Sequence, residues 1–277
     1  ATVYAGGALG DPSAQYDSAV TGVADIAVGL HGYHPGDFPL TEVIELPFMA
    51  SNSIQGTKTL WALYENIPEI AAEYEDVKVI GLFTGDPNIL ITSDKKIESA
   101  ADLKNLKMRS PAPVANRIFE TFGAAPVSIP APDLYESMMR GVVDGALTSA
   151  SAVPNFALAD VTKYATRDPI YTTSFYIVMN KNTWNKISPE DQEALSEIFG
   201  EALSLRFAEN YVNDEAAGWA LMEESGVEIV DLPDSEIEAW KEQLKVVSDQ
   251  WIEEMEAAGF PGQKIYDEAV RISAEHQ

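Results

Sequence analysis

The sequence predicts an α/β protein folded as two lobes around a cleft. Two runs of alternating strands and helices support this prediction, one near the N-terminus and one in the middle of the chain. A strand–helix–strand unit builds a parallel sheet, so each run indicates a sheet of its own. A helical stretch over residues 189–222 follows the second run. At 1.5 Å of rise per residue it is long enough to pack along both lobes.

The first run opens with a strand over residues 2–5. A helix over residues 11–21 follows, with Asp11 at its N-cap and Gly22 at its end. A buried strand over residues 25–30 completes the unit. Further on, apolar patterning predicts two helices and then two strands, over residues 53–63, 67–74, 77–83 and 89–92.

The second run and the last third of the chain are predicted from turn residues and helix caps. Strands and helices alternate over residues 106–109, 115–122, 125–129, 133–139 and 144–148. A strand over residues 174–179 then precedes the long helical stretch, whose N-cap is Ser188. A strand over residues 227–230 and a final helix over residues 235–258 end the prediction.

Composition excludes several classes of function. The 277 residues carry a formal net charge of −26, which repels nucleic acid and anionic membrane surfaces. An acidic surface suits a saline habitat or serves solubility in general. The chain has no cysteine, so it holds no disulfide, no cysteine-based zinc site and no thiol nucleophile. An anionic ligand would need a local positive group to overcome the overall field.

No catalytic or cofactor motif is present. The sequence lacks a Gly-x-Ser-x-Gly elbow, a Gly-x-Gly-x-x-Gly turn and a phosphate-binding loop. His31 and His34 have the spacing of a metal pair, but zinc needs a third ligand, and the glycine and proline around them predict a loop. We therefore expect a protein that is not an enzyme and that uses neither metal nor cofactor.

Three sequence blocks resemble the DctP-type solute-binding proteins of tripartite ATP-independent periplasmic (TRAP) transporters. The blocks are Asp-Leu-Lys-Asn-Leu-Lys-Met-Arg-Ser-Pro over residues 102–111, Phe-Gly-Ala-Ala-Pro-Val over 122–127, and Gly-Val-Val-Asp-Gly over 141–145. The resemblance implies a periplasmic-binding-protein-like clamp with a long helix spanning both lobes. It further implies a monomer in the periplasm that captures a small organic carboxylate and delivers it to the membrane permease subunits.

The chain departs from the family pattern in four places. The family begins with one more strand and helix than are found before residues 2–5. Thr148 stands where the family often has a ligand-binding asparagine. Ile89 occupies the position of a second arginine in sialic-acid binders, and Ala131 replaces their aromatic residue. The resemblance therefore does not extend to a sialic-acid pocket.

Arg109 and Thr148 are the principal candidates for ligand contact. Each ends a predicted strand, and open α/β sheets bind ligands beyond the carboxyl ends of their strands. A guanidinium can hold a carboxylate through two parallel hydrogen bonds. Spacing alone leaves Arg109 as either a surface arginine or a ligand contact, and the resemblance favours the contact. Thr148 is a ligand contact or an ordinary strand residue.

The remaining candidates lie near the expected crossings between lobes. Leu30 and His31 end the first buried strand, where family members line the pocket. Asn88 contacts the ligand or shapes a turn. Tyr171 and Phe175 form an aromatic wall or pack in the core.

We expect the chain to cross between the lobes near Asp86 and again near Thr173. Lobe one then holds residues 1–86 and 174–213, and lobe two holds residues 87–173 and 214–277. Two alternative functions remain open at this point. The protein could bind a small cationic amine such as ethanolamine through Glu45 or Asp86, or it could be an enzyme acting on a small organic acid.

Overall fold

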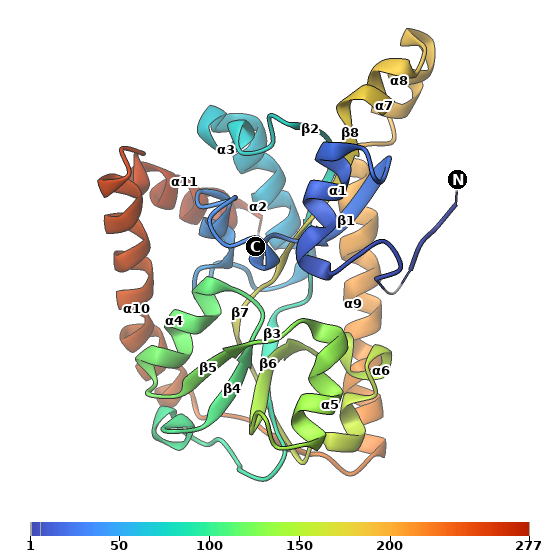
Figure 1. The fold of residues 1–277 in the computed structure, drawn as a ribbon. Helices are drawn as coiled ribbons and strands as arrows, with labels where there is room; N and C mark the ends of the chain where they lie inside the picture. The colour runs from blue at the N-terminus through green and yellow to red at the C-terminus, as the bar shows by residue number, and fades with distance from the viewer. Residues whose placement is uncertain (1, 6, 277) are drawn as a thin grey trace.

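The fold is built on two β-sheets (Figure 1). The structure, a computed structural model, describes residues 2–5 and 7–276. The first sheet has the order β1–β8–β2, formed by Ile26–Leu30, Ser174–Asn180 and Val77–Thr84. The second has the order β5–β4–β6–β3–β7–β9, formed by Ala125–Ser128, Lys107–Ser110, Gly145–Ser149, Asn88–Thr92, Tyr164–Tyr171 and Glu228–Val230. The predicted two-lobed α/β fold is confirmed.

The first sheet is antiparallel, contrary to the prediction of a parallel unit. Strand β8 follows β3 to β7 of the second sheet in the sequence. It lies between β1 and β2 and runs antiparallel to both. Residues 2–5 form no strand, because they run through solvent without a pairing partner (Figure 1). Val3 is 87% exposed. The predicted N-terminal strand is therefore wrong.

The second sheet has the predicted parallel pairs at the end that begins with β5. Strand β4 runs parallel to both β5 and β6, and β3 joins antiparallel to β6. Strand β7 was not predicted, because Arg167, Asp168 and Pro169 interrupt its apolar pattern. These residues fall in an irregularity where the pairing of β7 with β3 shifts register.

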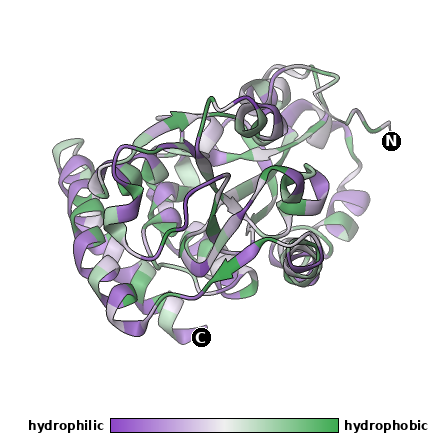
Figure 2. Ribbon diagram, turned by 90° about the horizontal axis from the view of Figure 1, so that it is seen from below, coloured by the Kyte–Doolittle hydropathy of each residue, from purple (hydrophilic) through white to green (hydrophobic). Residues whose placement is uncertain are grey.

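Helices cover both sheets. The α-helices of the first two thirds are α1 (Gln15–Thr21), α2 (Ser53–Asn66), α3 (Pro68–Ala72), α4 (Pro113–Thr121), α5 (Leu134–Met139) and α6 (Ala152–Asn155). Short 3-10 helices are η1 (Pro12–Ala14), η2 (His31–Tyr33), η3 (Thr41–Glu45), η4 (Ala100–Leu103), η5 (Ala131–Asp133) and η6 (Leu158–Val161). Along the peripheral helices hydrophilic and hydrophobic stretches alternate, as one apolar face per helix requires (Figure 2).

The predicted continuous helix over residues 189–222 is wrong. After α7 (Lys181–Lys186), the chain forms α8 (Pro189–Ser196) and then a separate helix, α9 (Glu201–Glu224). The break falls at Gly200, whose φ of 81° lies in the left-handed region that favours glycine. A Cβ there would also stand 3.0 Å from the Trp61 ring. Helix α9 still runs the length of the molecule along both sheets (Figure 1).

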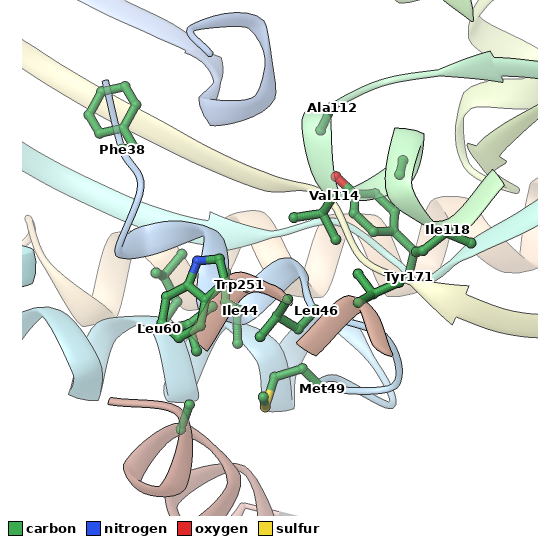
Figure 3. Packing of buried hydrophobic residues seen from close by; sticks show 14 of the residues in the cluster. Phe38, Ile44, Leu46, Met49, Leu60, Ala112, Val114, Ile118, Tyr171 and Trp251 are labelled. Carbon is green, nitrogen blue, oxygen red and sulfur yellow. The ribbon is translucent and has the colours of Figure 1, made fainter. Parts of the chain in front are cut away.

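Two helices end the chain where one was predicted. Helix α10 (Asp234–Ala257) packs against α4, and α11 (Gly262–Glu275) turns back to pack against α2. Trp251 of α10 is fully buried beside Ile44 and Leu60 (Figure 3), and its indole N–H donates to the Pro39 carbonyl at 2.9 Å. The C-terminal helices therefore contact elements beside both sheets. No helix in the described part of the chain has the length and apolar character needed to cross a membrane.

Substituting Gly218→Ala should destabilise the protein, although alanine is the better helix former. A Cβ at Gly218 in α9 would lie 1.9 Å from the Ala150 carbonyl oxygen, so the helix or the loop must move. Such overpacking costs about 1–3 kcal/mol, whereas an open helical site would gain up to about 1 kcal/mol. Urea unfolding measures the sign. The exposed Ala217→Ser on the same helix should change stability by less than about 0.5 kcal/mol.

Candidate ligand-binding site

A cavity of about 390 Å³ lies between the two sheets. Residues from both sheets and from α9 line it, which places it where a ligand would touch both lobes at once. The lining comprises Val28, Leu30, Phe83, Asn88, Arg109, Pro111, Ala131, Thr148, Ser149, Ser151, Ala152, Asn155, Phe156, Thr173, Phe175, Phe207, Asn210, Tyr211 and Asp214.

Arg109 is a buried cation in the wall of this cavity, with only 2% of its surface exposed. Its Nε donates to the Ile129 carbonyl at 2.7 Å, and Nη1 donates to the Leu147 carbonyl at 3.0 Å. Its Nη2 donates to the Tyr33 hydroxyl at 3.4 Å. Among the described residues no carboxylate lies within 4.0 Å of the guanidinium, and burial lowers the pKa of Arg109.

The hydrogen bonds of Arg109 within the protein do not use all of its N–H donors. Guanidinium carries five N–H groups, of which neutral oxygens occupy one on each nitrogen. One N–H therefore remains on Nη1 and one on Nη2. Two terminal nitrogens with one N–H each to spare can bind the two oxygens of a carboxylate.

Neutral polar groups accompany the guanidinium on the buried side of the cavity. Asn88 donates from Nδ2 to the Thr173 hydroxyl at 2.8 Å, and both residues are buried. Thr148 is also buried, and its hydroxyl makes no hydrogen bond to another described residue. These groups offer donors and acceptors but no second charge.

Aromatic rings form another part of the cavity lining. Phe83 of β2 and Phe175 of β8 are paired in register and stack with ring centres 4.9 Å apart and planes 2° apart. Phe207 of α9 stacks on Phe83 at 5.0 Å, and Tyr211 lies 5.4 Å from Phe175. The site thus combines a cationic end with a flat apolar wall, an arrangement that suits an organic anion bearing a ring or chain.

Five of the seven residues predicted for the site line the cavity. They are Leu30, Asn88, Arg109, Thr148 and Phe175. His31 and Tyr171 do not, contrary to expectation, because both are buried and hydrogen-bonded to other side chains. His31 contacts the hydroxyls of Ser174 and Tyr74 at 2.9 and 2.7 Å, and the Tyr171 hydroxyl donates to Glu45 at 2.5 Å.

Several lining residues were missed by sequence reasoning. Helix α9 contributes two i,i+4 pairs, Phe207 with Tyr211 and Asn210 with Asp214, and that spacing was the available signal. Tyr33, which contacts Arg109 but is not among the lining residues, also gave no signal, since it lies in a loop rich in glycine and proline. Its hydroxyl nevertheless accepts a hydrogen bond from the Ala131 backbone at 2.9 Å, in addition to that from Arg109, and so links η2 to the second lobe.

The two acids proposed for a cation site are placed elsewhere. Glu45 is 1% exposed and Asp86 is 0% exposed, and neither lines the cavity. Asp86 accepts hydrogen bonds from the Ser151 hydroxyl at 2.5 Å and from its backbone N–H at 3.3 Å. Across the described residues no three His, Cys, Asp or Glu side chains are grouped as metal ligands would be.

A two-lobed α/β fold with a charged, aromatic-walled cavity between its sheets defines a solute-binding protein. Comparison of the sequence with family models gives a match over residues 1–254 to the bacterial extracellular solute-binding proteins, family 7, the DctP family. The chain belongs to this family. Its members and the similar solved structures are binding proteins, which excludes the enzyme alternative.

Two solved structures are similar over nearly the whole chain. A TRAP solute-binding protein from Rhodoferax ferrireducens T118, in complex with copurified benzoate, is 30% identical, with a TM-score of 0.93 over 96% of this chain and 84% of that one. A TRAP solute-binding protein from a marine metagenome, specific for aromatic acids and bound to metahydroxyphenylacetate, is 29% identical, with a TM-score of 0.93 over 97% and 85%.

A curated relative shows the same extent of similarity. The outer membrane transporter protein TsaT of Comamonas testosteroni is 26% identical over 269 residues, which cover 94% of this chain and 77% of TsaT.

The burial of Asp86 predicts a pH-dependent effect of Asp86→Asn. Burial raises the pKa of Asp86 from 3.8 to about 7, so the folded state holds a proton that the unfolded chain releases. Its contribution to stability is present below about pH 4 and is lost as the pH rises through about 7. The free energy of unfolding of Asp86→Asn, relative to that of the wild type, should therefore rise by about 2–3 kcal/mol when the pH is raised from 5 to 8.

Denaturant unfolding at the two pH values measures this difference. Asp214→Asn, at an exposed residue of the cavity lining, is the control for the loss of one acidic side chain. A pH-independent difference for Asp86→Asn would contradict the assignment of a neutral, buried Asp86.

Proposed function

We propose that this protein is the extracytoplasmic solute-binding protein of a TRAP transporter and captures a small organic carboxylate. The observation that carries the proposal is the buried guanidinium of Arg109, which faces the cavity without an acidic partner among the described residues. A buried charge is costly unless it is paired, so the anionic ligand serves as the counterion. The protein would act in the periplasm, as a monomer, and deliver its ligand to the membrane permease subunits.

The walls of the cavity favour an aromatic carboxylate within this class. Phe83 and Phe175 present stacked rings to the cavity that Arg109 lines, and its volume of about 390 Å³ admits one small ring with its substituents. The relatives bound to benzoate and to metahydroxyphenylacetate support the same class. In our proposal the carboxylate binds the Nη1 and Nη2 fork, and the ring lies against the phenylalanines.

The binding mechanism in this proposal is closure of two lobes. Lobe one would comprise residues 1–86 and 174–213, and lobe two residues 87–173 and 214–277. The chain passes from β2 to β3 at residues 85–87 and returns from β7 to β8 at residues 172–173. A ligand that contacts both sheets binds the closed form more tightly and so shifts the population towards it.

Benzoate and related aromatic acids should raise the melting temperature of the protein. A ligand that binds only the folded state, at about 100 times its Kd, adds about 2.7 kcal/mol to the free energy of unfolding. Thermal-shift screening of aromatic carboxylates, aliphatic carboxylates, amines and neutral sugars tests the class. Stabilisation by amines or sugars alone would contradict the proposal. If only aliphatic acids stabilise the protein, the proposal of a carboxylate ligand stands and the proposed role of the aromatic wall is wrong.

Arg109→Ala should weaken binding of the best carboxylate by roughly 30-fold to several thousand-fold. Removing one partner of a buried charge pair typically costs about 2–5 kcal/mol. Arg109→Lys should recover only part of the affinity, since an ammonium lacks the planar fork. Isothermal titration calorimetry gives both values. Arg140→Ala removes an exposed arginine from the same lobe and should bind as the wild type does. Wild-type affinity in Arg109→Ala would remove the residue from the site.

A further inference from the structure

The two predicted site residues that do not reach the cavity, His31 and Tyr171, belong to one buried hydrogen-bonded chain. Its centre is Glu45, the last residue of η3. Glu45 Oε2 accepts the Tyr171 hydroxyl at 2.5 Å. Glu45 Oε1 accepts both the backbone N–H and the hydroxyl of Ser174, at 2.9 and 2.6 Å. One carboxylate thus receives three donors from two residues that are three positions apart in sequence.

Those two residues flank the second crossing between the lobes. Tyr171 is the last residue of β7 in the second sheet, and Ser174 is the first residue of β8 in the first sheet. Only Thr172 and Thr173 lie between them. Glu45 therefore holds the strand ends on both sides of the hinge, and its position fixes the path of the chain through it.

The crossing held by Glu45 carries part of the ligand cavity. The Thr173 hydroxyl accepts from Asn88, and both residues line the cavity. The Thr173 carbonyl accepts the Gly85 N–H at 2.9 Å, which ties the first crossing to the second. Phe175, one residue beyond Ser174, forms the aromatic wall. A shift of the crossing would displace these groups together.

The same carboxylate also orients η2. Because the Ser174 hydroxyl donates its hydrogen to Glu45, His31 must donate from Nδ1 to the Ser174 oxygen. His31 Nε2 then accepts from the Tyr74 hydroxyl. This requires neutral imidazole, and burial lowers the pKa of His31 to about 3. Two residues further on, Tyr33 reaches across to Arg109 and Ala131.

We propose that Glu45 is a positioning residue of the ligand site, which acts through Tyr171 and Ser174 without touching the ligand. The inference rests on the proposed function, since it concerns affinity for the carboxylate. Burial raises the pKa of Glu45 and burying its polar carboxyl group costs free energy, a cost that an apolar residue of similar size would avoid. The rival explanation is that Glu45 contributes to folding alone.

Graded variants, with benzoate as the probe, separate these explanations. Tyr171→Phe removes one donor to Glu45 and should weaken benzoate binding roughly tenfold, on the scale of one buried hydrogen bond. Glu45→Gln keeps an oxygen that can accept from Ser174, so its loss of affinity for benzoate should be of the same size. Glu45→Leu abolishes all three bonds and should lose about 100-fold. The partial rescue by glutamine relative to leucine is part of the expected result.

A double-mutant cycle tests whether Glu45 acts through Tyr171. If it does, Glu45→Gln combined with Tyr171→Phe should bind benzoate no more weakly than Glu45→Gln alone. The control is Tyr176→Phe on β8, which removes a hydroxyl that contacts His34 at 2.9 Å and makes no hydrogen bond to Glu45, Tyr171 or Ser174. It should lower the melting temperature and leave the Kd for benzoate unchanged.

The outcomes distinguish this inference from the proposed function. If the wild type binds benzoate and the Glu45 and Tyr171 variants bind it equally well while melting lower, Glu45 is structural only and the inference is overturned. Should Glu45→Leu fail to fold, Tyr171→Phe and Glu45→Gln decide the matter. Absence of binding by the wild type to benzoate and to every other carboxylate screened would overturn the proposed function itself, and the inference with it.

Discussion

The guanidinium of Arg109 is buried among neutral oxygens, and the design of the binding site follows from that placement. Carbonyls of Ile129 and Leu147 orient the group but do not neutralise it. A charge held in this way raises the cost of the unliganded closed state, because water is excluded from the fork without a counterion to replace it. In the proposed function a carboxylate bound by Arg109 removes that cost, and affinity and closure then have one electrostatic origin.

The topology makes such a site possible by routing one strand through the middle of the first sheet. Strand β8 follows directly on β7 of the second sheet and pairs with both β1 and β2. The two crossings consequently lie side by side, joined by the Gly85–Thr173 hydrogen bond, and Thr173 of the second crossing lines the cavity. Helix α9 closes the opposite side with Phe207 and Tyr211.

The sequence predicted the helices and strands that local residue patterns specify, and it missed the features that depend on tertiary packing. Strands β4 and β6, with Arg109 and Thr148 at their ends, follow from short apolar runs between turn residues. The close packing of Gly200 against Trp61, which is distant in sequence, is not visible in the local pattern. The inward direction of Tyr171 depends on a register shift between β3 and β7 that no local pattern encodes. The family resemblance indicated residues that line the cavity, but it did not indicate the residues that hold them in place.

The net charge of −26 has a kinetic consequence for a protein that binds an anion. The acidic surface opposes the approach of the ligand over long distances, whereas the contact with Arg109 acts only at close range and away from solvent. Dissolved ions weaken the first effect strongly, since the Debye length is about 8 Å at 0.15 M salt, and the second hardly at all. Added salt should therefore speed the capture of ligand while leaving its residence time nearly constant. This is the reverse of the behaviour of proteins that attract their ligands by overall charge.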